Sequence, residues 1–254
     1  MFRQTTWEHG YLTLVSAQLH FSRPILVANQ YTVTTSCEWD DFVQGATQDL
    51  TEHFCFIKKR HSWSRLLISE ELLFNLMSYY SIFPSFLQTI SLFGVQVSEG
   101  DRPVGFFFQL LTRLRAHDGG LQNLAVNGYE LHYVLRYVEK HGRDLSNPWS
   151  MRKMAICHKF AREGNISSWI IVHGSKTLQD RLTAPRAEPI SSLHGWDALE
   201  ASAASNHLLI LLDALRNWDD YIEYLSAEFK DTVSLAYCPN LNKKANTFAP
   251  YVER

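Results

Sequence analysis

A heptad-spaced row of apolar residues toward the C-terminal end constrains the fold of this chain most strongly. Its members follow one another at alternating intervals of three and four residues: Leu208, Leu211, Leu215, Trp218, Ile222, Leu225 and Phe229. This spacing averages about 3.5 residues and places the seven side chains along one face of an α-helix. The sequence therefore predicts a long helix over about residues 197–237, and a chain that contains it is not all-β.

Two interpretations of this apolar face stay open. The face could pack along the rest of its own domain, as the apolar faces of most helices do. Alternatively, it could associate with a second copy of the chain or with another protein, because three heptads is the shortest run that is typical of a coiled coil. We treat the seven residues as candidates for self-association and expect a homo-oligomer or a protein partner bound through this helix.

Three segments in the middle of the chain have the patterns of β-strands. Aromatic and leucine side chains alternate with other residue types over residues 129–138, which is typical of a strand with two different faces. Residues 149–160 and 169–172 also have strand composition, and turn-forming residues lie between them at 163–165. We expect these three segments to pair as an antiparallel meander.

Weaker patterns predict further elements in the first third of the chain. Residues 54–57 resemble a short strand, and residues 64–68 resemble a second strand that could pair with it. Residues 11–15 could also form a strand, and residues 39–50 could form a short helix. These patterns do not establish whether residues 1–50 share a core with the segments that follow.

One stretch without charged residues, 74–97, is long enough to be tested as a membrane span. It contains eight polar side chains and has Pro84 near its middle, so we expect two buried helices instead of a span. Ser69 should cap the first helix, because serine is a preferred N-cap residue. The acidic residues that follow it in the first turn interact favourably with the helix dipole. Gly94 is a typical stop for the second helix.

Together, these patterns predict an α/β (α+β) fold. It has a mostly antiparallel central sheet, flanking helices and a long C-terminal helix. Residues 1–50 form an N-terminal segment without a clear pattern, residues 51–237 form the main domain, and residues 238–254 form a loose tail.

Charge and cysteine content exclude several functional classes. The chain has 24 Lys+Arg and 26 Asp+Glu, a formal net charge of −2, whereas a nucleic-acid-binding protein normally carries a basic excess. It has four cysteines and no Cys-x-x-Cys pair, which is too sparse for a disulfide framework and favours reduced thiols. The N-terminus lacks the pattern of a secretory signal. We therefore expect a cytoplasmic protein that does not bind nucleic acid.

Motifs for catalysis are missing. Residues 174–177 resemble the end of a phosphate-binding loop, but they lack the glycine before Lys176 and an earlier glycine that the motif requires. Cys157 and His158 are adjacent in a predicted strand, where neighbouring side chains point to opposite faces, so we interpret Cys157 as a buried structural residue. We predict that the chain is not an enzyme. The remaining enzymatic alternative is a pocket lined by Glu130, His132, Arg136 or His158.

Metal ligands are scarce. The best acidic cluster is on the long helix and contains Asp213, Asp219, Asp220 and Glu223. Asp220 and Glu223 are three residues apart and share a helix face, and carboxylate oxygens suit Mg²⁺ or Ca²⁺. Asp219, Asp220 and Glu223 are therefore weak candidates for metal ligands, and a solvated helix face is the alternative.

Several segments together resemble one known family, the soluble N-terminal domain of fungal CorA-like transporter proteins. They are HSWSRLLIS at 61–69, FPSFL at 83–87, YELHY at 129–133, RYVE at 136–139, PWSMR at 148–152, SWIIV at 168–172 and NWDDYI at 217–222. The likeness covers about residues 50–237, and its motifs are structural, not catalytic.

The resemblance implies a cytosolic regulatory or assembly domain of a divalent-cation transporter. Proteins of this kind resemble CorA-type Mg²⁺ channels, in which two membrane helices follow a long helix and a Gly-Met-Asn signature lines the pore. This sequence has no Gly-Met-Asn and ends at Arg254 before any membrane helix, so no pore residue has a matching position. The alternative function is a soluble protein-interaction module without a role in transport.

Overall fold

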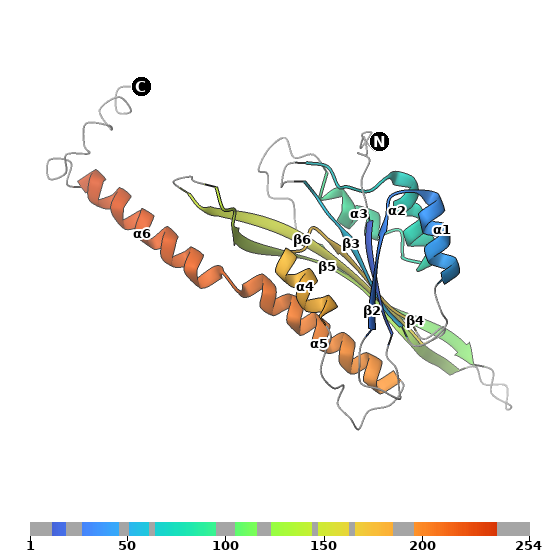
Figure 1. Cartoon of the computed structure of the whole chain (residues 1–254). Coiled ribbons are helices and arrows are strands. Elements are labelled where there is room, and N and C mark those ends of the chain that lie inside the picture. Colours follow the sequence, from blue (N-terminus) through green and yellow to red (C-terminus); the bar gives the residue numbers. More distant parts are fainter. Residues whose placement is uncertain are drawn as a thin grey trace.

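The chain forms a seven-stranded sheet with helices on both faces, as a computed structural model shows (Figure 1). The structure describes residues 12–18, 27–45, 51–60, 64–94, 105–115, 123–143, 147–162, 166–184 and 196–237. The predicted tail, 238–254, lies outside these residues.

The sheet has the spatial order β2-β1-β3-β7-β6-β5-β4. Its strands are β1 (Leu12–Gln18), β2 (Val27–Val33), β3 (Thr51–Ile57), β4 (Phe106–Arg115), β5 (Asn123–Lys140), β6 (Trp149–Ala161) and β7 (Ile166–Val172). All neighbouring strands are antiparallel except β3 and β7, which run parallel. The mostly antiparallel sheet and the β5-β6-β7 meander predicted from the sequence are thereby confirmed.

Helices cover the sheet in two groups. They are α1 (Ser36–Gly45), α2 (Glu70–Tyr79), α3 (Phe86–Ser91), α4 (Lys176–Thr183), α5 (Trp196–Leu215) and α6 (Trp218–Tyr237). Figure 1 shows α1, α2 and α3 on one face of the sheet and α4 and α5 on the other, while α6 continues past the sheet. The flanking helices and the long C-terminal helix were both predicted.

Alternating side chains of the central strands fill two separate cores. On β3, Cys55 and Ile57 pack with the α1–α3 group, whereas Phe54 and Phe56 pack with α4 and α5. The two sets come from one strand because successive side chains point to opposite faces of a sheet. Where both faces are buried, the strands have short continuous apolar runs, at residues 154–157 of β6 and 169–172 of β7.

The uncharged stretch at 74–97 contributes to two short helices, as predicted. Ser69 caps α2, since its Oγ accepts a hydrogen bond from the backbone N–H of Leu72 at 3.1 Å, and Leu73, Leu76 and Phe86 are fully buried against the sheet. Among the described residues, no helix is both long and apolar enough to cross a bilayer.

One prediction about local structure was wrong. Residues 64–68 form no strand; one isolated bridge joins Lys59 to Leu66, and the apolar pattern reflects the burial of Leu66 and Ile68 in a connecting segment. The predicted long C-terminal helix is present as α5 and α6, and Arg216 and Asn217 form a turn between them.

Gly128 sits at an irregularity in β5. Its φ is +152°, and an added Cβ would lie 2.0 Å from the carbonyl oxygen of Phe160 on β6. The register between β4 and β5 also shifts here, beside Leu111, as it does at a β-bulge.

We predict that Gly128→Ala lowers the free energy of unfolding by about 2–3 kcal/mol or more, because the backbones of β5 and β6 must move apart. Gly105→Ala is the matched control, since an added Cβ there meets nothing within 4 Å. Urea denaturation of both variants measures the difference, and equal stabilities would contradict the close approach.

Candidate functional site

The heptad-spaced residues face solvent. Six of the seven are exposed, among them Leu215 (63%) and Phe229 (69%), whereas Trp218 is half-buried. We call these six exposed residues the apolar stripe: Leu208, Leu211, Leu215, Ile222, Leu225 and Phe229. The opposite face of α5 packs on the sheet through Leu199, Ala203 and Ile210. Of the two interpretations of the predicted helix, the structure therefore excludes packing of this face on its own domain within the described residues.

A buried carboxylate holds α5 on the sheet. Glu52 on β3 is 2% exposed, and its Oε1 accepts hydrogen bonds from Asn206 Nδ2 on α5 at 2.6 Å and from Trp169 Nε1 on β7 at 3.1 Å. Its Oε2 accepts from Ser202 Oγ, also on α5, at 3.1 Å. A buried carboxylate is costly unless it is hydrogen-bonded, so these bonds favour one position of α5 along the sheet.

A chain of hydrogen bonds through two histidines continues this contact. On β6, the Nε2 atom of His158 lies 3.1 Å from Ser167 Oγ. Its other ring nitrogen, Nδ1, lies 2.9 Å from His207 Nε2. His207 on α5 reaches the hydroxyl of Tyr133 at 2.8 Å, and the His158 ring stacks on Trp169 with centroids 3.7 Å apart. Burial lowers the pKa of His158 well below its usual range and that of His207 to about 4. Both rings are therefore neutral near pH 7.

The structure separates Asp213 from the other three residues of the predicted acidic cluster. Asp213 is buried and accepts a hydrogen bond from Ser175 Oγ at 2.6 Å, and Ser175 also caps α4. Asp219, Asp220 and Glu223 lie on α6 and are exposed. Asp213 therefore joins α4 to α5, and binding of a metal by the other three carboxylates stays a prediction.

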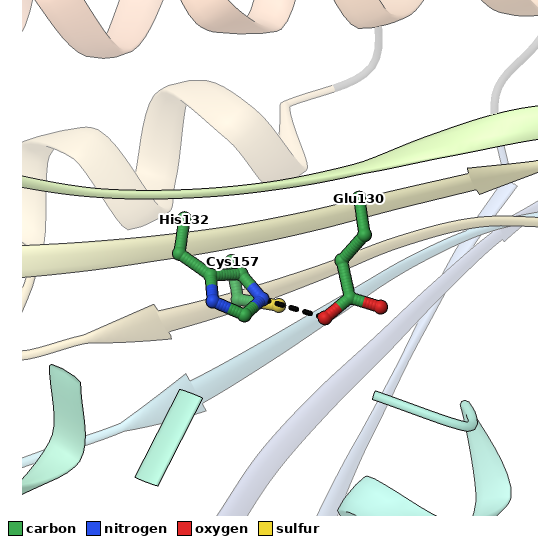
Figure 2. Close-up of side chains that lie close together, drawn as sticks. All are labelled: Glu130, His132 and Cys157. Atoms are coloured by element: carbon green, nitrogen blue, oxygen red, sulfur yellow. Dashed lines mark hydrogen bonds and ion pairs between the residues drawn. The ribbon is translucent and has the colours of Figure 1, made fainter. Parts of the chain in front are cut away.

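A different group of potential ligands meets on the other face of the sheet. Among the described residues, the group of three close enough to share one metal ion is Glu130, His132 and Cys157. Figure 2 shows the side chains of Glu130 and His132, from β5, meeting that of Cys157, from β6. Their ligand atoms all lie within 4.8 Å of one another, and all three residues are buried.

Strand geometry brings these three residues together. Glu130 and His132 are two residues apart on β5 and so point to one face, and His132 pairs directly with Cys157 across the β5–β6 ladder. The His132 ring packs edge-on against Phe86 of α3 with centroids 5.1 Å apart. The cluster therefore lies in the interface between the sheet and α3.

Hydrogen bonds and charge arrange the carboxylate of Glu130. Its Oε1 is 2.6 Å from His132 Nε2 and accepts a hydrogen bond from the backbone N–H of Phe83 at 2.8 Å. Its Oε2 lies 3.8 Å from Lys159 Nζ and has no hydrogen-bond partner in the described structure. Burial raises the pKa of the Cys157 thiol well above its usual value, so without a cation nearby this thiol stays protonated.

The enzymatic pocket considered from the sequence is not formed. Glu130 and His132 share a face, as expected, but His158 points to the opposite face, where it meets His207 and Trp169. The group expected from the sequence did not include Cys157. Its place beside His132 follows from the register of β5 and β6, which the sequence patterns do not give. Total burial also closes the group to a substrate.

Comparison with known families gives one match. A family profile described as CorA-like transporters matches residues 27–237 of this chain. No curated protein matches the chain.

We predict that the free energy of unfolding falls as the pH drops from 7 toward 5. The unfolded chain binds protons at its histidines with a pKa near 6.5, whereas folded His53 and His207 have a pKa of about 4. Below pH 6.5 the unfolded state therefore binds more protons, so acid favours unfolding. His207→Gln should reduce this pH dependence. Urea denaturation at the two pH values measures it, and a constant stability would contradict the neutral buried rings.

Proposed function

The chain belongs to the CorA-like transporter family, and from this premise we propose that it is a non-enzymatic assembly domain that self-associates through the apolar stripe of α5 and α6. The observation that supports the proposal is the exposure of that stripe. A water-exposed row of large apolar side chains is typical of an interaction surface.

The spacing of the stripe favours a helix as its partner. Side chains repeating every 3.5 residues form the seam of a coiled coil, in which each partner presents a similar row. The chain itself supplies such a row, so a second copy satisfies the requirement. The seam continues with the same spacing across the turn at Arg216 and Asn217, so both helices can contribute to one interface.

The surroundings of the stripe favour association on its solvent side. On α5, Ala214 borders the seam and is buried against the sheet, which leaves the side of Leu212 open, since Leu212 is 55% exposed. On α6, the corresponding flanking positions are Asp219 and Ser226 on one side and Tyr221 and Glu228 on the other. Uncharged residues therefore border the stripe on α5, whereas one carboxylate lies on each side of it on α6.

The position of α5 connects the stripe to the rest of the domain. Because Glu52 and His158 bind residues of α5 and Asp213 of α5 binds Ser175 at the start of α4, the stripe on α5 points outward in one fixed direction. In a divalent-cation transporter of fungal CorA-like type, this arrangement would let the domain assemble on the cytosolic side and transmit changes in assembly through the helix.

A protein-interaction module without a role in transport is the second candidate function. The same exposed stripe favours it, because a helix of another protein could occupy the seam. The two functions differ in one measurable property, which is whether the chain alone forms oligomers.

We predict that the purified chain is an oligomer and that Leu215→Asp combined with Ile222→Asp makes it monomeric. A charge buried in the seam without a partner costs several kcal/mol, so the dissociation constant should rise by about 100-fold or more. Light scattering coupled to size-exclusion chromatography measures the mass.

Ala227→Asp combined with Ser234→Asp is the matched control. It adds the same charge to exposed positions on the opposite face of α6 and should leave the oligomer intact. A folded double variant with the mass of the wild type would contradict self-association through the stripe. A wild-type chain that is monomeric at high concentration would favour the second candidate function.

A further inference from the structure

We propose that Glu130, His132 and Cys157 form a binding site for a divalent cation of the Zn²⁺ class. The site lies on the α3 side of the sheet, whereas α5 covers the opposite face (Figures 1 and 2). The proposal is independent of the self-association described above.

The donor set selects the class of cation. One thiolate, one imidazole nitrogen and one carboxylate oxygen are the ligands that Zn²⁺ takes in proteins, at about 2.0–2.3 Å. Mg²⁺ and Ca²⁺ prefer oxygen ligands alone, and a thiolate shifts the preference toward softer ions. The site therefore differs in chemistry from the exposed carboxylates of α6.

The distances are compatible with one shared ion. Two ligands of a tetrahedral zinc ion lie roughly 3.3–3.8 Å apart, which follows from bond lengths of about 2.0–2.3 Å. The three ligand atoms of this cluster are all within 4.8 Å of one another, so small rotations of the side chains bring them to these values. Three protein ligands leave a fourth position, as in sites that also hold a water molecule.

The unbound cluster leaves two buried polar atoms without a hydrogen bond. In the described structure, neither Glu130 Oε2 nor His132 Nδ1 has a hydrogen-bond partner, although Glu130 is 0% and His132 1% exposed, and the nearest cation to Glu130 Oε2, Lys159 Nζ, is 3.8 Å away. Unpartnered buried polar atoms are rare and costly. A bound cation would coordinate the carboxylate of Glu130.

Binding of the cation requires defined proton positions on two ligands. The Cys157 thiol releases its proton to water, and His132 coordinates through Nε2 as a neutral ring that carries its proton on Nδ1. Thiolate and carboxylate together carry −2 against the +2 of the cation, and the ammonium of Lys159, 3.8 Å from Glu130 Oε2, adds one further positive charge beside the site. The cation thereby stabilises the thiolate that burial alone disfavours.

One segment of the chain separates the cluster from solvent. The backbone of Phe83 binds Glu130, and the carbonyl of Ser81 accepts a hydrogen bond from Lys159. The same segment lines an open groove of about 390 Å³ together with Phe74, Met77 and Leu87. Ser81 has a left-handed φ of +51°, a conformation that costs a non-glycine residue about 1 kcal/mol or more. Displacement of this segment is the access route for the cation.

Cobalt titration of the full chain tests the proposal. Co²⁺ replaces Zn²⁺ at sites of this kind, and a thiolate ligand gives it a charge-transfer absorption band in the near ultraviolet. The variant Cys37→Ser combined with Cys238→Ser provides the background, because it leaves only Cys55 and Cys157. We expect about one Co²⁺ per chain, with the band abolished by added Zn²⁺.

Single substitutions in this background identify the ligands. Cys157→Ser should abolish the band, and His132→Gln and Glu130→Gln should each weaken binding by about 10-fold or more. Cys55→Ser is the matched control, since Cys55 is equally buried and lies in the same core as Cys157, yet it has no place in the cluster; it should keep the band.

Two results would overturn the proposal. The first is a background protein that folds, as its circular dichroism shows, and gives no charge-transfer band at excess Co²⁺. The second is a band that persists in Cys157→Ser or disappears in Cys55→Ser. If Cys157→Ser does not fold, Glu130→Gln decides the outcome, because unchanged affinity in this near-isosteric variant also contradicts the site.

Discussion

The carboxylate of Glu52 is the interaction on which the arrangement of this domain most depends. It lies under α5 near the middle of the sheet, where water cannot solvate it, and it accepts hydrogen bonds from β7 and from α5. Apolar contacts alone would tolerate a shifted helix, because they have little directionality. A buried carboxyl group disfavours such a shift, since each lost hydrogen bond leaves a buried polar oxygen less well compensated. The direction of the exposed stripe on α5 follows from these bonds.

The two faces of the sheet bury polar groups in different ways. Under α5, Glu52, Ser167, His158 and His207 form a connected chain of hydrogen bonds, although Asp213 Oδ1 on the same helix has no hydrogen-bond partner. On the α3 side, the cluster of Glu130, His132 and Cys157 is equally buried but leaves two polar atoms unpartnered. A connected network specifies one packing of a helix, whereas the α3-side cluster brings a carboxylate, an imidazole and a thiol within 4.8 Å of one another. This difference separates the part of the domain that positions the stripe from the part that we infer to bind a cation.

Prediction from the sequence succeeded where periodicity was strong. The alternation at residues 129–138 and the heptad spacing of Leu208 to Phe229 both predicted the observed elements. It failed at residues 64–68, where apolar residues are buried in a connecting segment without pairing. It also missed the turn at Arg216 and Asn217, because the apolar spacing continues through it, and it missed β2 and α4, whose patterns are short.

The sequence by itself determined the mixed architecture, the meander, the long C-terminal helix and the absence of catalytic motifs, because these depend on residue types and local spacing. Only the tertiary structure decided which face of α5 is covered and which residues meet across the sheet. Pairing of His132 with Cys157 depends on the register of two strands, and the outward direction of the stripe depends on contacts between Glu52 and residues about 150 positions later. Such long-range contacts are set by the packing of the whole fold, which local patterns do not encode.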